Sequence, residues 1–230
     1  MSTVLVTGVN RGLGLEFLKQ YAEAGWTVIG TCRDLSQAVE ASRIADESGS
    51  VELYPLEVAD VDSVAHLADS LSQRSIDVLI LNAGVMGAAS LSLESLDPDD
   101  FLHSLRVNTV MPALMIQAFR EAVKRSERRL IVGMSSILGS IAENTDGGLY
   151  SYRASKAGFN AVLRSASHDL RSDGITVLAM HPGWVQTDMG GENALIGTAE
   201  SIAGMREVID KATPQMSGSF VSYEGKQLPW

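Results

Sequence analysis

Short aliphatic and β-branched runs alternate along the chain with longer segments of helical periodicity. The short runs predict strands at Val4–Thr7, Thr27–Thr31, Val51–Leu56, Val78–Asn82, Leu130–Met134, Thr176–Met180 and Ser219–Val221. The periodic segments predict helices near residues 13–24, 36–47, 61–73, 98–125, 150–172 and 199–211. Several strands are apolar on both faces, as in a parallel sheet that helices cover on both sides. With no internal repeat or linker, this alternation predicts a doubly wound α/β fold of right-handed βαβ units, forming a single domain of residues 1–230.

The helix expected near residues 150–172 places a tyrosine and a lysine beside its apolar stripe. Tyr152 and Lys156 are four residues apart, so they lie one turn above each other on the edge that leads to Phe159 and Leu163. A lysine on the packed side of a helix needs a reason, because burying an unpartnered ammonium is costly. One reason is chemical: a nearby cation favours the phenolate, lowers the pKa of the tyrosine and makes it a usable acid/base. The alternative is a core tyrosine whose neighbouring lysine extends to water, and this helix alone favours that alternative.

Composition narrows the class of protein. The chain has 230 residues, of which 45% are hydrophobic and 21 are glycine, which suits one large α/β domain with many tight turns. A formal net charge of -10 argues against a nucleic acid or an anionic membrane as the main partner. The single cysteine, Cys32, excludes an internal disulfide and fits a reducing compartment. With no signal-peptide pattern after Met1, no bilayer-length apolar run and no metal-site pattern, the sequence predicts a soluble, cytoplasmic protein without a metal.

A glycine-rich turn, Thr7–Gly14, joins the first expected strand to the first expected helix. Its three glycines allow the backbone to approach a pyrophosphate, and the helix N-terminus offers free N–H groups and the positive end of a dipole. The spacing is G-x-x-x-G-x-G rather than the G-x-G-x-x-G of many dinucleotide-binding domains. The alternative is a tight turn that binds no ligand, but the placement between a strand and a helix favours a dinucleotide.

The end of the second expected strand bears on which dinucleotide is bound. An NAD-preferring site usually has an acidic residue here, whereas this chain has Cys32 followed by Arg33. Together with Arg11 in the glycine-rich turn, Arg33 suits the 2′-phosphate of NADP(H). The alternatives are an Arg33 that is merely solvated and an Asp34 that turns inward to the ribose hydroxyls. At its place after Arg33, Asp34 is expected to cap the next helix instead.

Residues that suit a ligand follow three further strands, at the carboxyl edge where open α/β sheets bind ligands. Residues 82–84 (Asn-Ala-Gly) leave room for a ligand, and residues 135–136 are two serines, although serine pairs are more often turn residues. His181 precedes a Pro-Gly turn and is expected to be structural. Residues 184–200 are expected to form a substrate loop, with residues 189–193 as a flexible lid.

The long helix expected near residues 98–125 contains a proline. Pro112 has no N–H to bond the carbonyl four residues earlier, which belongs to Asn108. The sequence therefore predicts a local kink that releases the Asn108 carbonyl to another partner, such as an ordered water. The alternative is a proline that the helix tolerates by chance.

Taken in order, these residues resemble the classical short-chain dehydrogenases/reductases over nearly the whole chain. The resemblance rests on the turn at residues 7–14, Asn82-Ala83-Gly84, Asn108, Ser135-Ser136, Tyr152-x-x-x-Lys156 and Pro182-Gly183. Residues 135–140, 152–156, 181–185 and 220–230 are similar to the C-factor-like branch, to which sniffer-type carbonyl reductases belong. Together with these motifs, the interpretation of Tyr152 and Lys156 as an acid/base pair is favoured over that of a core tyrosine beside a solvated lysine.

The resemblance implies a seven-stranded Rossmann-like sheet, a nicotinamide cofactor and a role for each of four residues. Tyr152 is implied as the general acid/base, and Ser136, the second serine of the pair, as the donor to the substrate oxygen. Lys156 is implied to bind the nicotinamide ribose and to lower the pKa of the tyrosine, and Asn108 to hold the water of a proton relay. The expected catalytic residues are thus Asn108, Ser136, Tyr152 and Lys156. The expected cofactor-binding residues are Gly8, Asn10, Arg11, Gly12, Leu13, Arg33, Glu57, Val58, Asn82, Ala83, Gly84, Tyr152, Lys156, Pro182, Gly183, Val185 and Thr187.

The chain departs from the family pattern in three places. Leu81 stands where the family usually has the first asparagine of Asn-Asn-Ala-Gly, which changes little. Glu57 replaces an aspartate that is usual near the adenine. The spacing from Ser136 to Tyr152 is a few residues longer than usual, and the added loop precedes the helix through which many family members oligomerise. A homo-oligomer, either a dimer or a tetramer, is expected.

The sequence thus predicts an NADPH-dependent reductase that converts a ketone or an aldehyde reversibly to an alcohol. The expected partner is a small-molecule carbonyl or alcohol substrate. The alternative is a C-factor-like NAD(P)-binding signalling or sensor protein in which turnover is incidental. The complete set of four catalytic residues favours the enzyme, because a sensor needs no acid poised over a nicotinamide.

Overall fold

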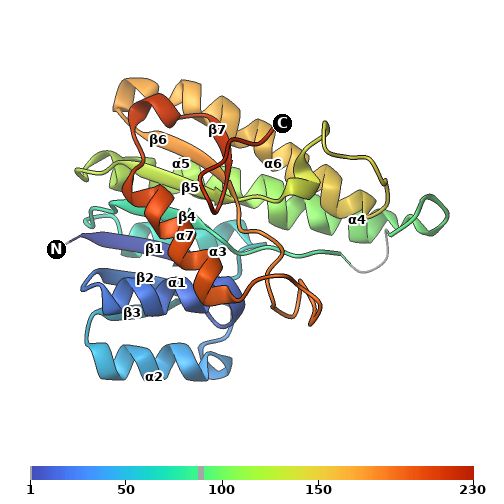
Figure 1. Cartoon of the computed structure of the whole chain (residues 1–230). Coiled ribbons are helices and arrows are strands. Elements are labelled where there is room, and N and C mark those ends of the chain that lie inside the picture. Colours follow the sequence, from blue (N-terminus) through green and yellow to red (C-terminus); the bar gives the residue numbers. More distant parts are fainter. Residues whose placement is uncertain (1, 88–90) are drawn as a thin grey trace.

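Seven parallel strands form one sheet in the computed structural model, which describes residues 2–87 and 91–230. The strands are β1 (Thr3–Thr7), β2 (Thr27–Cys32), β3 (Val51–Pro55), β4 (Val78–Leu81), β5 (Leu130–Met134), β6 (Thr176–His181) and β7 (Ser219–Ser222). Their order across the sheet is β3-β2-β1-β4-β5-β6-β7 (Figure 1), with every neighbouring pair parallel. The expected doubly wound parallel sheet is therefore confirmed. Met1, the first residue of the expected domain, lies outside the described residues.

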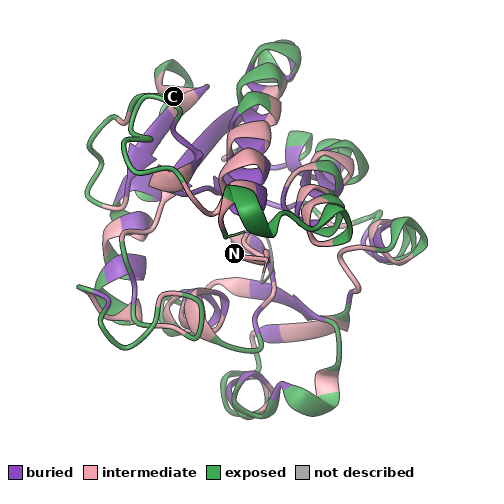
Figure 2. Ribbon diagram, turned by 90° about the vertical axis from the view of Figure 1, so that its right-hand side faces the viewer, coloured by how far each residue is buried: buried purple, intermediate pink, exposed green. Residues whose placement is uncertain are grey.

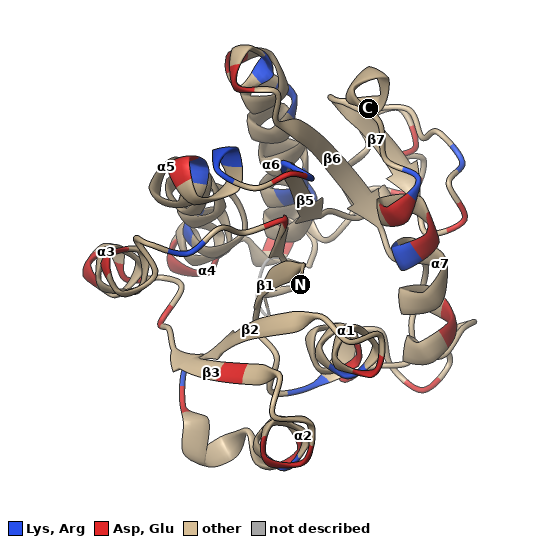
Figure 3. Cartoon of the chain, turned by 90° about the vertical axis from the view of Figure 1, so that its left-hand side faces the viewer, with Lys and Arg blue, Asp and Glu red and all other residues tan. Residues whose placement is uncertain are grey.

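Helices cover both faces of this sheet. They are α1 (Gly12–Glu23), α2 (Val39–Ser48), α3 (Val61–Ser70), α4 (Pro98–Leu105), α5 (Met111–Lys124), α6 (Tyr150–Asp169) and α7 (Thr198–Asp210). The helices α1, α2 and α7 pack on one face, and α3, α5 and α6 pack on the other (Figure 3). Figure 2 shows the strands mostly buried between helices whose outer sides are exposed.

The spacing of apolar residues explains these layers. In β1, Val4 and Val6 contribute to the core on one face of the sheet and Leu5 to the core on the other, because side chains alternate along a strand. In α5, Met115 and Phe119 are one turn apart and both buried, so a single stripe of the helix faces the sheet. Burying a side chain of the size of phenylalanine contributes about 1.5–3 kcal/mol, and a stripe of such residues holds the helix in place.

The long helix expected around Pro112 is divided in the structure. A π-helical turn, Arg106–Val110, separates α4 from α5, and the Met111 N–H donates to the Arg106 carbonyl, five residues earlier. Pro112 then lies in the first turn of α5, where a missing N–H costs little. The expected local irregularity is confirmed, in the form of a π turn that contains Asn108. The release of the Asn108 carbonyl to a water stays a prediction.

A second difference concerns the segment after β2. The helix expected near residues 36–47 begins only at Val39, because a separate 3-10 turn, Leu35–Gln37, precedes it. The Asp34 carboxylate caps that turn by accepting from the Ser36 N–H at 2.9 Å. The other elements agree with the expected bounds to within a few residues.

The strand order determines where a ligand can bind. β1 pairs with β2 on one side and with β4 on the other, so the loops after β1 and β4 diverge at the carboxyl edge and leave a crevice. The loops after β5 and β6 reach the same edge, because all seven strands are parallel. Within residues 2–87 and 91–230, no helix has the length and apolar composition that crossing a membrane requires.

Candidate active site

A cavity of about 850 Å³ opens at this carboxyl edge, lined by the loops that follow β1 to β6. Most of the expected site residues line it, namely Gly8, Asn10, Arg11, Gly12, Leu13, Arg33, Glu57, Val58, Asn82, Ala83, Gly84, Tyr152, Lys156, Pro182 and Thr187. The structure therefore brings the expected cofactor-binding residues and the expected catalytic pair, Tyr152 and Lys156, together in one cavity. Asn108, Ser136, Gly183 and Val185 lie outside this lining, and Val185 is buried.

The glycine-rich turn forms one wall of the cavity with its backbone. Gly8 has a φ of +78°, which side chains rarely adopt. A Cβ on Gly14 would lie 2.0 Å from the Gly8 carbonyl oxygen, so only glycine permits this close approach of turn and helix. No side chain caps the start of α1 at Arg11, which leaves the helix N-terminus facing the cavity. A bare backbone surface beside an uncapped helix start fits a pyrophosphate.

The Asn82 side chain fixes this turn through hydrogen bonds to its backbone. Its amide nitrogen donates to the main-chain oxygens of Thr7, at 2.8 Å, and of Gly8, at 3.2 Å. In return, the Thr7 hydroxyl accepts from the N–H groups of Asn82 and Ala83 at 2.9 and 3.0 Å. The ends of β1 and β4 are therefore tied together, and the supporting role of Thr7 lies inside the turn that the sequence had already marked.

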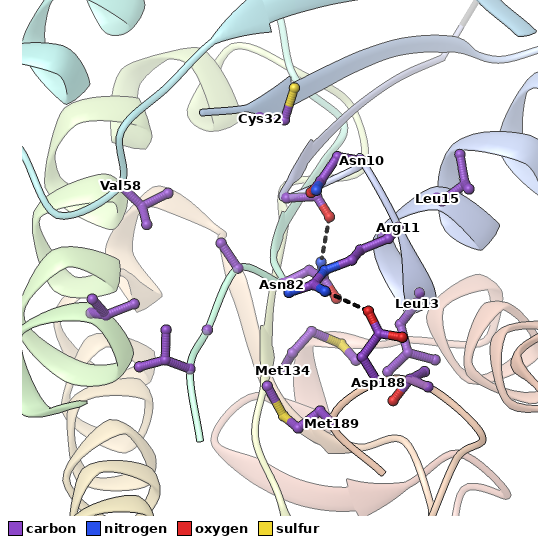
Figure 4. Close-up of a pocket in the computed structure, with 18 of the residues that line it drawn as sticks. Asn10, Arg11, Leu13, Leu15, Cys32, Val58, Asn82, Met134, Asp188 and Met189 are labelled. Carbon is purple, nitrogen blue, oxygen red and sulfur yellow. Dashed lines mark hydrogen bonds and ion pairs between the residues drawn. The ribbon is translucent and has the colours of Figure 1, made fainter. Parts of the chain in front are cut away.

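The two arginines of the expected 2′-phosphate site have acidic partners. Arg11 forms an ion pair with Asp188, and Figure 4 shows these side chains directed toward each other. Arg33 Nη1 lies 3.7 Å from Glu57 Oε2, a loose contact of two solvent-accessible groups. Asp34 also lines the cavity, but its carboxylate is engaged by Ser36, and these hydrogen bonds hold the pKa of the Asp34 carboxyl below its usual value. The expectation that Asp34 caps the following segment is confirmed.

Lys156 is buried and has a main-chain partner. Its Nζ donates to the Met134 carbonyl at 2.8 Å, at the end of β5. Burial lowers the pKa of Lys156 to about 8, because the charged form loses its hydration. Met134 is a site residue that the sequence analysis missed, and no side-chain pattern could have revealed it, because only its carbonyl takes part.

The pKa of Tyr152 is shifted in the direction opposite to the expected one. Burial raises it, and the nearby Ser136 side chain acts in the lowering direction without cancelling that effect. The Lys156 ammonium is engaged by the Met134 carbonyl and lies 5.8 Å from the centre of the tyrosine ring. The pKa of Tyr152 is therefore raised overall in the protein in this state, because desolvation dominates, and its lowering by Lys156 stays a prediction.

The two serines after β5 have different surroundings. Ser135 is structural: its hydroxyl donates to Asn160 Oδ1 at 2.5 Å, and its N–H donates to the Met180 carbonyl at 2.8 Å. Ser136 is the serine whose side chain acts on the pKa of Tyr152 in the lowering direction, and its hydroxyl accepts from the Leu138 N–H at 3.2 Å. The choice of the second serine as the residue beside the tyrosine agrees with this arrangement.

Asn108 joins the π turn to its neighbours through its side chain. Its amide nitrogen donates to the Val85 carbonyl at 2.7 Å and to the Ser155 hydroxyl at 2.9 Å, while its Oδ1 accepts from the Val85 N–H at 2.9 Å. Thr109 adds a bond from its hydroxyl to the Ser155 carbonyl at 2.7 Å. The Asn108 side chain thus links the segment after β4 to α6. Its partner in α6, Ser155, directly precedes Lys156 in the sequence.

The expected substrate loop follows β6 and has internal order. The Trp184 indole N–H donates to the Gly190 carbonyl at 2.8 Å, and the Leu195 N–H donates to the Trp184 carbonyl at 3.0 Å. Asp188 and Met189 line the cavity; the sequence analysis placed both in the substrate loop but not among the cofactor-binding or catalytic residues. Their place depends on how the loop folds back, which residue types alone do not specify.

His181 takes no part in the cavity. Burial lowers the pKa of its imidazole to about 4, and its carbonyl accepts from the Tyr223 N–H at 2.8 Å, which agrees with a structural role. Among residues 2–87 and 91–230, no group of three or more His, Cys, Asp or Glu side chains is placed to hold a metal ion.

Comparisons with known proteins agree with this site. A family model described as short chain dehydrogenase matches residues 2–195. The chain is 42% identical over 163 residues to the C-signal of Myxococcus xanthus, which covers 71% of this chain and 98% of that protein. It is 36% identical over 236 residues to a 1-hydroxy-2-glutathionyl-2-methyl-3-butene dehydrogenase of Rhodococcus sp. (strain AD45), covering 100% of both.

Solved structures give the same result. The carbonyl reductase Sniffer of D. melanogaster matches with a TM-score of 0.94 and 34% identity, covering 100% of both chains. An NADPH-bound carbonyl reductase from chicken fatty liver matches with a TM-score of 0.94 and 34% identity, covering 100% of this chain and 99% of that one. The chain therefore belongs to the short-chain dehydrogenase/reductase family, in its C-factor-like, sniffer-type branch, and is an NAD(P)-dependent oxidoreductase.

Proposed function

We propose that the protein is an NADPH-dependent reductase that converts a ketone or an aldehyde to an alcohol, with Tyr152 as the general acid/base. One observation carries the proposal: Tyr152 and Lys156 are buried together at the cavity, and the Ser136 side chain is near enough to act on the pKa of the tyrosine. A positioned acid beside a second hydrogen-bond donor is suited to protonating a carbonyl oxygen. The likeness to carbonyl reductases, one of them NADPH-bound, supports the same substrate class and cofactor.

The residues present fit this cofactor. Gly8, Gly12 and the uncapped start of α1 would hold the pyrophosphate, and Arg33 with Arg11 would hold the 2′-phosphate. The small segment Asn82-Ala83-Gly84 would leave room for the dinucleotide, Lys156 would bind the nicotinamide ribose, and Thr187 with the neighbouring Val185 would hold the carboxamide. When bound, NADPH supplies the hydride for the carbonyl carbon.

The side chains of the protein move and hold the proton. In reduction, the Tyr152 hydroxyl gives its proton to the substrate oxygen, to which Ser136 donates a hydrogen bond. Burial raises the pKa of Tyr152 and so keeps the phenol protonated and ready to donate at neutral pH. Lys156, with its pKa near 8, is mostly charged at neutral pH, and its ammonium stabilises the phenolate that remains. In alcohol oxidation these steps run in reverse.

Asn108 completes the proton path through its backbone. Its side chain is already engaged with Val85 and Ser155. Its main-chain carbonyl, which Pro112 cannot bond, is the group that holds the relay water. Water held there connects the buried tyrosine with solvent.

The substrate is a small carbonyl or alcohol that residues 184–200 help to enclose. Trp184, half exposed, and the loop of residues 141–149 shape the entrance. The Rhodococcus relative, named as a dehydrogenase of a hydroxy compound, makes the oxidative direction part of the test. A homo-oligomer, a dimer or a tetramer, is proposed from the family pattern and is tested by light scattering.

A panel of ketones and aldehydes tests this function through the loss of NADPH absorbance, with Tyr152→Phe as the matched blank. We expect turnover of at least one compound, and formation of NADPH from NADP⁺ with the corresponding alcohol. Tight NADPH binding without turnover in either direction would contradict the reductase.

The second candidate function is an NAD(P)-binding signalling or sensor protein with incidental turnover. The similarity to the C-signal of Myxococcus xanthus favours it. The Tyr152→Phe variant separates the two, because only a sensor retains its function in the cell when turnover has been lost.

A further inference from the structure

The C-terminal segment folds back on β7 and ends beside the loop that precedes α6 (Figure 1). The Ser222 N–H donates to the Lys226 carbonyl and the Leu228 N–H to the Phe220 carbonyl, both at 2.8 Å. The Trp230 ring stacks on the Phe220 ring, with their centroids 5.5 Å apart and their planes 23° apart. Phe220 is completely buried, so Trp230 is fixed to the core of the protein.

The main-chain oxygen of Trp230 accepts three hydrogen bonds from this loop. The Ile141 N–H donates at 2.7 Å, the Ser140 hydroxyl at 3.0 Å and the Ala142 N–H at 3.3 Å. Ser140 is buried, whereas residues 141–147 are exposed. The Trp230 oxygen therefore holds the loop at the point where it leaves the protein interior.

The residues held in this way continue directly from the active site. Ser136 begins the single turn Ile137–Gly139, and the Ser140 N–H closes that turn by donating to the Ile137 carbonyl at 2.9 Å. Gly139 lies so close to α6 that a Cβ on it would be 2.8 Å from Lys156 Cβ. A displacement of Ser140 is therefore transmitted to the Ser136 hydroxyl on one side and to Lys156 on the other.

We propose that Trp230 is a positioning residue for the reaction at Tyr152. The Trp230 ring packs on Phe220 and thereby fixes the position of the Trp230 main-chain oxygen. That oxygen holds Ser140 and Ile141, and these residues keep the Ser136 hydroxyl in place beside the tyrosine. This inference rests on the proposed carbonyl reduction. The nucleotide end of the cavity is built from β1, α1, β2 and β4 instead, and Lys156 is one cofactor contact among many, so loss of Trp230 slows the chemical step far more than it weakens NADPH binding.

Four variants test the role of Trp230. A chain that ends at Pro229 lacks both ring and oxygen, Trp230→Ala lacks the ring, and Trp230→Phe keeps both features. The matched control in the same segment is Lys226→Ala, which removes an exposed side chain paired with Glu224. For the chain ending at Pro229 we expect kcat to fall roughly 10- to 100-fold, as for misplaced catalytic groups, with the Kd for NADPH within about twofold. The kcat of Trp230→Ala is expected to lie between those of the wild type and the shortened chain. The kcat values of Trp230→Phe and Lys226→Ala are expected to match that of the wild type.

Hydrogen exchange of the Ile141 and Ala142 amides provides a readout that needs no turnover. We expect faster exchange at both amides in the chain ending at Pro229 and unchanged exchange in α1. If the wild type reduces no carbonyl, the proposed function fails, and unchanged exchange in the shortened chain would then overturn the anchoring as well. If the wild type is active, an unchanged kcat in the shortened chain, or a loss of NADPH affinity as large as the loss in kcat, overturns the proposal.

Discussion

The two ends of the cavity are built in different ways. At the nucleotide end the wall is backbone, and the charged side chains stand in solvent: Arg11 is 72% exposed and Arg33 81%. At the catalytic end Tyr152 and Lys156 are buried, and Lys156 is hydrogen-bonded to the Met134 carbonyl. Exposed ion pairs contribute little and re-form easily, whereas burial shifts pKa values strongly. Substitutions at the nucleotide end are therefore expected to change cofactor choice, and substitutions at the catalytic end to change the reaction and the stability of the fold.

The largest effect is expected for Tyr152→Phe. It removes the proton donor and hardly changes the shape of the side chain. We expect kcat to fall roughly 10²- to 10⁴-fold, the usual contribution of general acid–base catalysis, with the Kd for NADPH nearly unchanged. Steady-state kinetics and fluorescence titration measure the two quantities. A kcat within about tenfold of the wild type, a barrier change of only ~1.4 kcal/mol, would refute the assignment of Tyr152.

Next in size is a pH effect on stability that arises from Lys156. Its pKa is about 8 in the folded protein and 10.5 in an ordinary lysine, so in this window the unfolded chain holds a proton that the folded protein has lost. The free energy of unfolding should therefore rise with pH between these values, by about 3 kcal/mol at most. Urea unfolding of wild type and Lys156→Met measures it. Parallel pH dependence of the two proteins would show that Lys156 is not the group responsible.

At the nucleotide end, Gly14→Ala tests whether the backbone forms the site. The new Cβ would lie 2.0 Å from the Gly8 carbonyl oxygen, so the turn must shift. We expect a loss of about 1–3 kcal/mol of stability, as for an overpacked site, together with weaker NADPH binding. Gly197→Ala is the matched control, because its Cβ would meet nothing within 4 Å. Unchanged NADPH affinity in Gly14→Ala would mean that the turn does not hold the pyrophosphate.

The narrowest effect is expected for Arg33→Ala, because it concerns cofactor choice alone and leaves the fold and the reaction unchanged. A hydrogen bond to a charged group typically contributes ~1.5–3 kcal/mol, so kcat/KM with NADPH should fall roughly tenfold to a hundredfold. Efficiency with NADH should change little, because NADH has no 2′-phosphate. Kinetics with both cofactors decide between the alternatives. Equal losses with both would indicate that Arg33 supports the fold, and a wild type that prefers NADH would contradict the cofactor assignment.

The elements and the order of the catalytic motifs could be predicted from the sequence, because both depend on local spacing. The seven strands follow from short apolar runs, and Tyr152 with Lys156 follows from a helical spacing of four. The π turn was foreseen only as an irregularity at Pro112. Its form depends on hydrogen bonds between Asn108 and the distant residues Val85 and Ser155, which no local pattern contains.

Three features of the site could not be predicted, for related reasons. The partner of Lys156 is the main-chain carbonyl of Met134, and a carbonyl is present at every residue. The direction of Arg11 depends on how the loop after β6 folds back to bring Asp188 near. The raised pKa of Tyr152 depends on burial in three dimensions, which the motif does not report.

The pH dependence of the reaction in both directions tests the role of Tyr152 most directly. Carbonyl reduction needs the phenol and alcohol oxidation needs the phenolate, so kcat for reduction should fall with rising pH while kcat for oxidation rises. Both changes should share one pKa in the alkaline range, because burial raises the pKa of this tyrosine, and neither should remain in the residual activity of Tyr152→Phe. Profiles that change in the same direction, or an inflection that persists in Tyr152→Phe, would contradict Tyr152 as the group that exchanges the proton.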